Sequence, residues 1–212
     1  MNTPVIAGTP VFTSDDWPGW AGPKGDWTPP TPGAAPLPRD WGRYRGMYLH
    51  GSRVVIAYTV GDVAVLESPG TETGDGGPIL TRSLEIGPTS KPLTLFVCRL
   101  PPGQVANERL NGVPVASVPQ GDTRSAVAIQ ATGIDALWVD ASGHVTVVIP
   151  PSESLRRIAL HYWRGPGADL AKFAGRVKSS AAPADLAAIT KPGPPRWGPP
   201  LETRGQLGAD DG

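Results

Sequence analysis

Five residues whose side chains could take part in acid–base chemistry lie close together in the stretch RGMYLHGSRVVIAYTVGDVAVLESPG (45–70). They are Tyr48, His50, Tyr58, Asp62 and Glu67. Imidazole, carboxyl and phenol groups are common proton donors and acceptors in active sites, so the stretch could be a catalytic cluster. It could equally be a β-hairpin whose polar residues lie on the solvent-facing side.

The order of apolar residues in this stretch favours the hairpin. Two sets of residues alternate along the chain, as on the two faces of a β-strand: Val54, Ile56, Tyr58 and Val60 in one set, and Arg53, Val55, Ala57 and Thr59 in the other. Gly61-Asp62 follows, and glycine at the first position suits a two-residue type II′ turn. The pattern predicts a strand–turn–strand unit over 53–67, with His50 and Glu67 near its ends, where polar residues cost little.

The remaining residue types indicate no catalytic or metal site. His50, His144 and His161 have no partner at a metal-ligand spacing such as HxxxH or HxH. The sequence contains no GxSxG, P-loop or GxGxxG motif. We therefore expect structural or solvent-facing histidines, no catalytic residue and no metal ligand, and an enzyme with an unrecognised site is the least favoured alternative.

The single cysteine, Cys98, lies in the apolar run LTLFVCRL. One thiol cannot form a disulfide within the chain, and the absence of CxxCH excludes covalent haem attachment here. We expect Cys98 to be a small buried side chain and no cofactor to be bound by this chain.

Tryptophans are concentrated in the first 43 residues, among many prolines. Four of the seven lie there: Trp17, Trp20, Trp27 and Trp41. A solvated linker would contain few aromatic residues, so these indoles are expected to plug grooves on the folded body from an extended strap. The alternative is a binding surface for a carbohydrate or a protein, for which the four tryptophans, Tyr48 and His50 are the candidate residues.

Charge and hydropathy exclude several classes of partner. The chain has 19 basic and 19 acidic residues, and no basic run. The segment WGRYRGMY (41–48) interleaves aromatic residues with arginine, but without net positive charge we expect no nucleic-acid binding. No run of about 18 apolar residues predicts a membrane span, and the first 17 residues lack the basic and apolar regions of a signal peptide.

Short strand-like runs separated by Gly- and Pro-rich turns predict an all-β fold. They lie at 53–67, 79–86, 92–100, 125–132, 136–140, 144–151 and 155–163. The runs 92–100 and 144–149 are apolar on both faces, as in central strands. We expect an antiparallel β-sandwich-like domain with a Pro/Trp-rich N-terminal strap and short C-terminal helices.

The chain is expected to divide into four parts. These are an irregular strap (1–43), the β-sandwich-like domain (44–165), short helices near 168–177 and 183–190 within 166–191, and a Pro-rich tail or linker (192–212). Asn111-Gly112 is a further type I′ turn signal. The polar ending predicts that the chain is an N-terminal fragment of a longer protein.

The region around residues 41–67 also resembles a known family. The sequence WGRYRGMYLHGSRVVIAYTVGDVAVLE is similar to an element that opens a domain of unknown function in large secreted proteins of planctomycetes and their relatives. The segments LTRSLEIGPTSKPLTLFVC and IALHYWRG are similar to the continuation of that domain, and WGPPLETRGQLGADDG to a linker that follows it. The resemblance covers about 36–212, and YTVG…VLE is its most specific part.

The resemblance implies a parent protein that combines a propeller-like dehydrogenase region with a c-type cytochrome module. Such a parent is periplasmic or secreted and can carry haem c. We therefore expect a non-catalytic accessory β-domain of a larger extracytoplasmic oxidoreductase-like protein, whose partners are the propeller and cytochrome domains. The alternative from the residues is the carbohydrate- or protein-binding module that uses exposed tryptophans.

Overall fold

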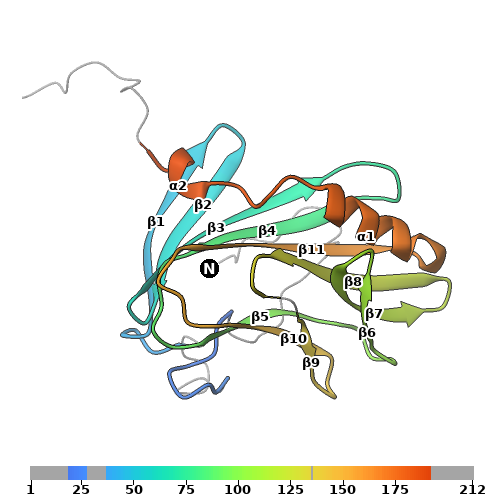
Figure 1. The fold of residues 1–212 in the computed structure, drawn as a ribbon, viewed down its shortest axis with the longest axis horizontal. Helices are drawn as coiled ribbons and strands as arrows, with labels where there is room; N and C mark the ends of the chain where they lie inside the picture. Colours follow the sequence, from blue (N-terminus) through green and yellow to red (C-terminus); the bar gives the residue numbers. More distant parts are fainter. Residues whose placement is uncertain (1–18, 28–36, 135, 192–212) are drawn as a thin grey trace, which may run out of the picture.

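Two antiparallel sheets of unequal size form the body of the protein (Figure 1). The computed structural model describes residues 19–27, 37–134 and 136–191. The larger sheet contains, in spatial order, β1 (Gly42–His50), β2 (Arg53–Val60), β3 (Val63–Glu72), β4 (Ile79–Ile86), β11 (Arg156–Pro166), β8 (Thr123–Ala131), β7 (Val113–Gln120) and β6 (Ala106–Leu110). The smaller sheet contains β5 (Leu93–Arg99), β10 (His144–Ile149) and β9 (Trp138–Val139).

The main core lies between the two sheets, which confirms the predicted all-β sandwich-like fold. Strand β11 shows how the sequence divides the two faces of the larger sheet. Ile158, Leu160 and Tyr162 belong to the core between the sheets, whereas Trp163 belongs to a second apolar cluster on the outer face. Side chains alternate along a strand, so this single strand contributes to both layers.

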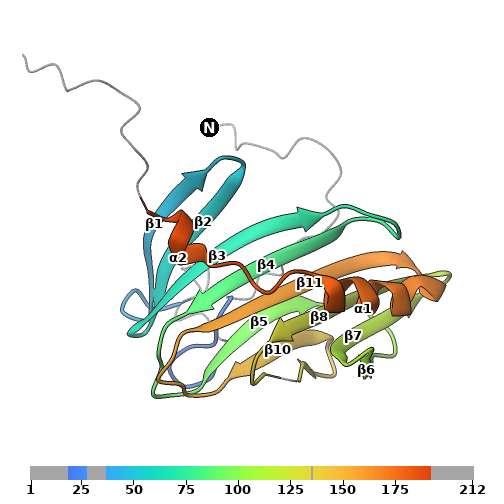
Figure 2. The same ribbon diagram turned by 45° about the horizontal axis from the view of Figure 1, so that its top comes forward.

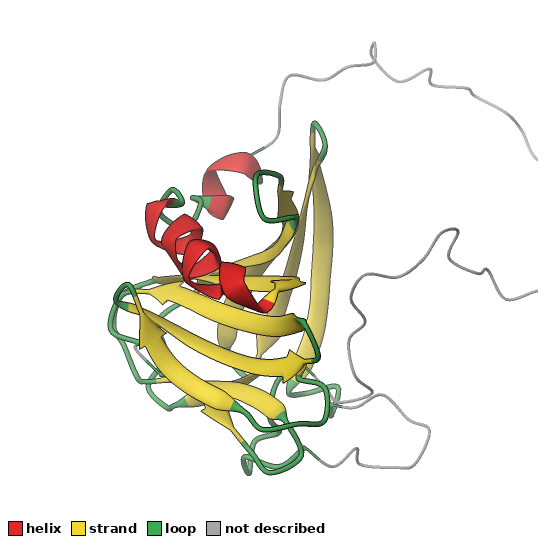
Figure 3. Ribbon diagram, turned by 90° about the vertical axis from the view of Figure 1, so that its right-hand side faces the viewer, coloured by secondary structure: helices red, strands yellow, loops and turns green. Residues whose placement is uncertain are grey.

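The expected C-terminal helices cover the outer face of the larger sheet (Figure 3). A 3₁₀ turn, η1 (Gly167–Asp169), leads into α1 (Leu170–Ser179), and α2 (Leu186–Ile189) follows. Leu170, Phe173 and Val177 recur at helical spacing and are buried. Phe173 stacks on Trp163 of β11 with ring centroids 5.3 Å apart.

The Gly61-Asp62 turn is confirmed. Val60 pairs with Val63, which leaves a two-residue connection between β2 and β3. Gly61 has φ +56° and its N–H donates to the carbonyl of Trp41 at 2.7 Å. A Cβ at Gly61 would lie 2.7 Å from the Trp41 ring, so both conformation and space require glycine here.

The Asn111-Gly112 turn is also confirmed, but the strand after it was not among the expected ones. Asn111 has φ 53° and Gly112 has φ 86°, as a type I′ turn requires. The following residues form β7, in which Val115 and Val118 are fully buried. Two prolines in VPVASVPQ weaken its strand pattern, because proline cannot donate to a ladder.

Strand β5, expected at the centre of a sheet, lies at the edge of the smaller one. Residues 19–21, in the blue segment of Figure 1, cover this edge. The Ala21 N–H donates to the Thr94 carbonyl at 2.9 Å, and the Phe96 N–H donates to the Gly19 carbonyl at 3.0 Å. Part of the expected strap thus satisfies backbone groups that an edge strand leaves unpaired.

The β1–β2 hairpin lies at the end of the molecule away from β9 and β10 (Figures 1 and 2). No other described strand pairs with the outer edge of β1. The smaller sheet has only three strands, so it cannot cover the whole inner face of an eight-stranded sheet.

Removing the Phe173 ring tests whether α1 belongs to the folded core. Phe173 is 1% exposed, so Phe173→Ala is expected to lower the free energy of unfolding by about 3–5 kcal/mol through lost burial and the cavity left behind. Urea unfolding followed by tryptophan fluorescence measures the change. The neighbouring exposed substitution Lys172→Ala should change it by less than about 0.5 kcal/mol, and equal effects of the two substitutions would contradict the packing described.

Candidate functional site

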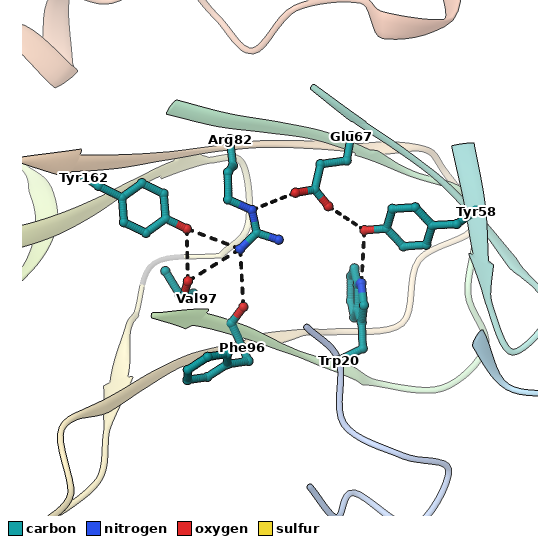
Figure 4. A network of polar contacts seen from close by, with 7 residues as sticks. All are labelled: Trp20, Tyr58, Glu67, Arg82, Phe96, Val97 and Tyr162. Carbon is teal, nitrogen blue, oxygen red and sulfur yellow. Dashed lines mark hydrogen bonds and ion pairs between the residues drawn. The ribbon is translucent and has the colours of Figure 1, made fainter. Parts of the chain in front are cut away.

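A chain of polar side chains lies in the interior between the sheets (Figure 4). The carboxylate of Glu67 on β3 accepts hydrogen bonds from the Tyr58 hydroxyl and from the Nε of Arg82, both at 2.7 Å. The Arg82 guanidinium also donates to the Tyr162 hydroxyl at 3.3 Å. At the other end, the Trp20 indole N–H donates to the Tyr58 hydroxyl at 3.0 Å.

This network connects the larger sheet to β5 of the smaller sheet. The Tyr162 hydroxyl donates to the Val97 carbonyl at 3.1 Å. One Arg82 nitrogen reaches the carbonyl oxygens of Phe96 and Val97, each at 3.5 Å. Four strands of the larger sheet (β2, β3, β4 and β11) therefore meet β5 of the smaller sheet and the segment at Trp20 around one ion pair.

Burial raises the pKa values of the two phenols in the network and of a neighbouring thiol. Burial, reinforced by the Glu67 charge, raises the pKa of Tyr58. Burial likewise raises the pKa of Tyr162, although the neighbouring Arg82 opposes it. Burial raises the pKa of the nearby Cys98 thiol to about 12. Both phenols and the thiol therefore stay protonated near neutral pH, and the hydrogen bonds of the network link the two sheets.

The fold separates the acid–base residues of the stretch 45–70. Tyr48 and His50 are exposed on β1, whereas Tyr58 and Glu67 meet inside. The expectation that Glu67 lies near a strand end is wrong, because β3 continues to Glu72. The alternation of side chains along the strand indicates the inward position of Glu67. Val63 and Val65 face the core, and Glu67 is the next residue on the same face.

The candidate tryptophans differ in their surroundings. Trp20 is 4% exposed within the main core. Trp27 is half-buried and makes an edge contact with Phe96, with ring centroids 6.0 Å apart. Trp41 is half-buried against Gly61, and its indole N–H donates to the Ala21 carbonyl at 2.9 Å. Trp17 lies outside the described residues.

A second polar location is a groove of about 370 Å³ on the outer face of the larger sheet. Strands β2, β3, β4 and β11 and residues 181–184 line it, and its polar side chains include Arg53, Glu72, Thr81, Ser83 and His161. Thr81 lies directly opposite His161 in the ladder. The sequence places these residues far apart, and only the order of strands brings them together.

His161 is the most unusual side chain of this groove. It is 2% exposed, and neither ring nitrogen has a hydrogen-bond partner among the described residues. Burial lowers its pKa, while the charge of Glu72 opposes the shift. The imidazole is therefore neutral at pH 7, with one nitrogen that donates and one that accepts.

His144 has a carboxylate partner four residues earlier in the chain, Asp140. Its Nδ1 lies 2.9 Å from an Asp140 carboxylate oxygen, and the same carboxylate accepts from the backbone N–H groups of Ser142 and His144. The pair closes the turn before β10, a common role for aspartate. The described residues contain no group of three or more His, Cys, Asp or Glu that could hold a metal ion, and none of their helices has the length and apolar character of a membrane span.

Comparison with known proteins gives a match to the first part of the chain. The model of a family described as Domain of unknown function (DUF6797) matches residues 1–67. This part of the chain is similar to a domain of unknown function. The matched region includes YTVGDVAVLE, the element on which the resemblance rests, and ends at Glu67 within β3. No curated protein and no solved structure is significantly similar to the chain.

Substitutions in the Glu67–Arg82 ion pair should show how much the pair contributes to the free energy of unfolding. Glu67→Gln leaves the half-buried Arg82 charge without its counter-ion, so the free energy of unfolding should fall by about 1–3 kcal/mol, less than for a fully buried pair. Replacing both partners, as in Glu67→Leu with Arg82→Met, should restore much of that loss because no charge is left without its counter-ion. Urea unfolding of both variants provides the comparison.

The exposed Glu108 on β6 offers a matched control for the ion pair. Glu108→Gln should change the free energy of unfolding by less than about 0.5 kcal/mol. A Glu67→Gln variant as stable as this control would show that the Glu67–Arg82 contact does not support the fold.

The buried His161 should make stability depend on pH. Its pKa is lowered from 6.5 in the folded protein, so below pH 6.5 the unfolded chain binds a proton that the folded chain does not. The contribution of His161 to the free energy of unfolding is fully present above pH 6.5. It falls as the pH drops toward the folded-state pKa, by up to about 1.4 kcal/mol per pH unit. Urea unfolding over that window should show a flatter pH profile for His161→Leu, and an unchanged profile for His50→Leu. Identical profiles for wild type and His161→Leu would contradict the burial of a neutral imidazole.

Proposed function

We propose that this chain is a non-catalytic accessory β-domain of a larger extracytoplasmic protein of the oxidoreductase and cytochrome class. The single observation that carries the proposal is an apolar surface at the β1–β2 hairpin that the described part of the chain leaves exposed. This surface would pack against a further domain of the parent protein.

The uncovered surface, which we call the hairpin patch, consists of Tyr44, Met47, Leu49, Val54 and Ile56. Tyr44 is 70%, Met47 55% and Leu49 72% exposed. Met47 lies opposite Ile56 and Leu49 opposite Val54 in the ladder, so these four side chains share one face of the hairpin. Large apolar side chains gathered on a free edge are typical of an interaction surface.

Geometry explains why the described residues leave this face exposed. The hairpin patch continues the inner face on which Tyr58, opposite Tyr44, packs against the main core. The three-stranded sheet covers that core but not the distal hairpin (Figure 2). A further β-rich domain that extends the smaller layer would bury the patch and pair with the free edge of β1.

The oxidoreductase and cytochrome context rests on the family resemblance of YTVG…VLE. Covalent haem would have to be bound by another domain, because this sequence has no CxxCH. The raised pKa values of Tyr58, Tyr162 and Cys98 support a non-catalytic role for the interior network. A periplasmic or secreted location follows from the same resemblance and is part of the proposal.

The proposal is tested with the protein segment encoded next to this chain. The adjoining coding DNA is expected to encode propeller-like strands and a CxxCH motif, and the segment it encodes is produced separately. Sedimentation should show a complex with the chain, and Met47→Lys with Leu49→Lys should weaken binding at least tenfold by placing charge in an apolar interface. Both sites are exposed, so the free energy of unfolding should change by less than about 0.5 kcal/mol per site.

Leu155 is a matched control, since it is 47% exposed and lies outside the hairpin patch. Leu155→Lys should leave the complex intact. The proposal would be refuted if Leu155→Lys weakened the complex as much as Met47→Lys with Leu49→Lys does. It would also be refuted if no adjoining coding frame existed. Turnover of sugar or alcohol substrates with an artificial electron acceptor by the chain alone would refute its non-catalytic part.

A further inference from the structure

Residues 181–184 cross the outer face of the larger sheet between α1 and α2, and two hollows adjoin them. The hollow that contains His161 has a volume of about 370 Å³, and the one that contains Gln130 about 550 Å³. Ala182 and Pro183 line both. We call residues 181–184 the covering segment.

Small side chains form the sheet surface beneath the covering segment. Ser83 on β4 lies opposite Ala159 on β11, and Gly70 on β3 lies opposite Thr81. These residues line the hollow that contains His161. Larger residues at these positions would fill the space, so the sequence of the strands itself keeps the hollow open.

Polar side chains that carry buried atoms without partners line both hollows. Both nitrogens of His161 and the Oε1 of Gln130 are buried and have no hydrogen-bond partner among the described residues. His161 lines the first hollow and Gln130 the second. Buried polar groups in folded proteins are almost always hydrogen-bonded, so these atoms point to a molecule that completes the site.

The charges around His161 define what kind of molecule fits. Glu72 and Arg53 line the same hollow and have opposite charges, while His161 is neutral near pH 7 because burial lowers its pKa. A free anion would meet Glu72, and a free cation would meet Arg53. The remaining polar groups of the hollow are mainly hydroxyls, including those of Thr81 and Ser83.

We propose that the hollow around His161 binds a neutral molecule rich in hydroxyl groups, a saccharide, beneath the covering segment. Each ligand hydroxyl can both donate and accept, which matches the one donor and one acceptor of a neutral imidazole. The Glu72 carboxylate accepts, and the Arg53 guanidinium donates. The volume lies within the range of small-molecule sites.

The covering segment is held at its two ends. On one side, the Ser180 hydroxyl donates to a Glu72 carboxylate oxygen at 3.1 Å. On the other, the carboxylate of Glu85 accepts hydrogen bonds from the backbone N–H groups of Leu186 and Ala187. Glu72 thus lines the hollow and also binds Ser180 beside the covering segment. We therefore expect saccharide binding to protect the backbone N–H groups of residues 180–187 from hydrogen exchange.

The test titrates the full chain with D-glucose, D-galactose, maltotetraose and cellotetraose. The His161 imidazole signals in ¹H–¹⁵N spectra should shift with at least one of them, while those of the exposed His50 stay in place. Calorimetry should show binding at least tenfold weaker for His161→Leu, which removes both nitrogens, and for Ser83→Val, which fills the hollow. His50→Leu should bind as the wild type does.

Several outcomes would overturn the proposal. These are no shift of the His161 signals with any of the four saccharides, unchanged affinity in folded His161→Leu and Ser83→Val, or stronger binding of inorganic phosphate or glucuronate than of neutral saccharides. If either His161→Leu or Ser83→Val fails to fold, the affinity of the other variant still tests the proposal. Met47→Lys with Leu49→Lys should leave saccharide binding intact, which separates this site from the hairpin patch.

Discussion

The ion pair between Glu67 and Arg82 is the interaction on which the rest of the structure depends. A charged pair in the interior is tolerated only when its remaining donors and acceptors are satisfied, and here Tyr58 and Tyr162 extend it to the chain at Trp20 and the backbone of β5. The apolar core brings the two sheets together without fixing their relative position. The directional bonds around Arg82 set that position, because its acceptors lie on three strands of both sheets, β3, β11 and β5.

The unequal size of the two sheets determines where function can lie. Eight strands face three, so parts of the larger sheet need other cover. Helix α1 covers the outer face near Trp163, and residues 181–184 cross the polar part around His161. The inner face of the β1–β2 hairpin has no described cover, and both surfaces for which we propose partners follow from this mismatch.

Local patterns predicted the local structures well. Gly61-Asp62 and Asn111-Gly112 form turns because their conformations depend on two residues and their immediate neighbours. Strand β11 and helix α1 follow their periodicities for the same reason. The prolines of β7 obscured its strand pattern, and β5 lies at an edge because residues 19–21 supply backbone partners that no strand pattern could reveal.

By itself, the sequence determined the fold class, the turns and the absence of the common catalytic motifs, since these depend on residues near one another along the chain. Only the tertiary structure decided that Glu67 lies beside Arg82 in the interior and that His161 lies opposite Thr81 in a groove. The partners of these residues come from strands distant in sequence. Their charge states and contacts depend on burial, and burial is a property of the packed sheets, which no single segment specifies.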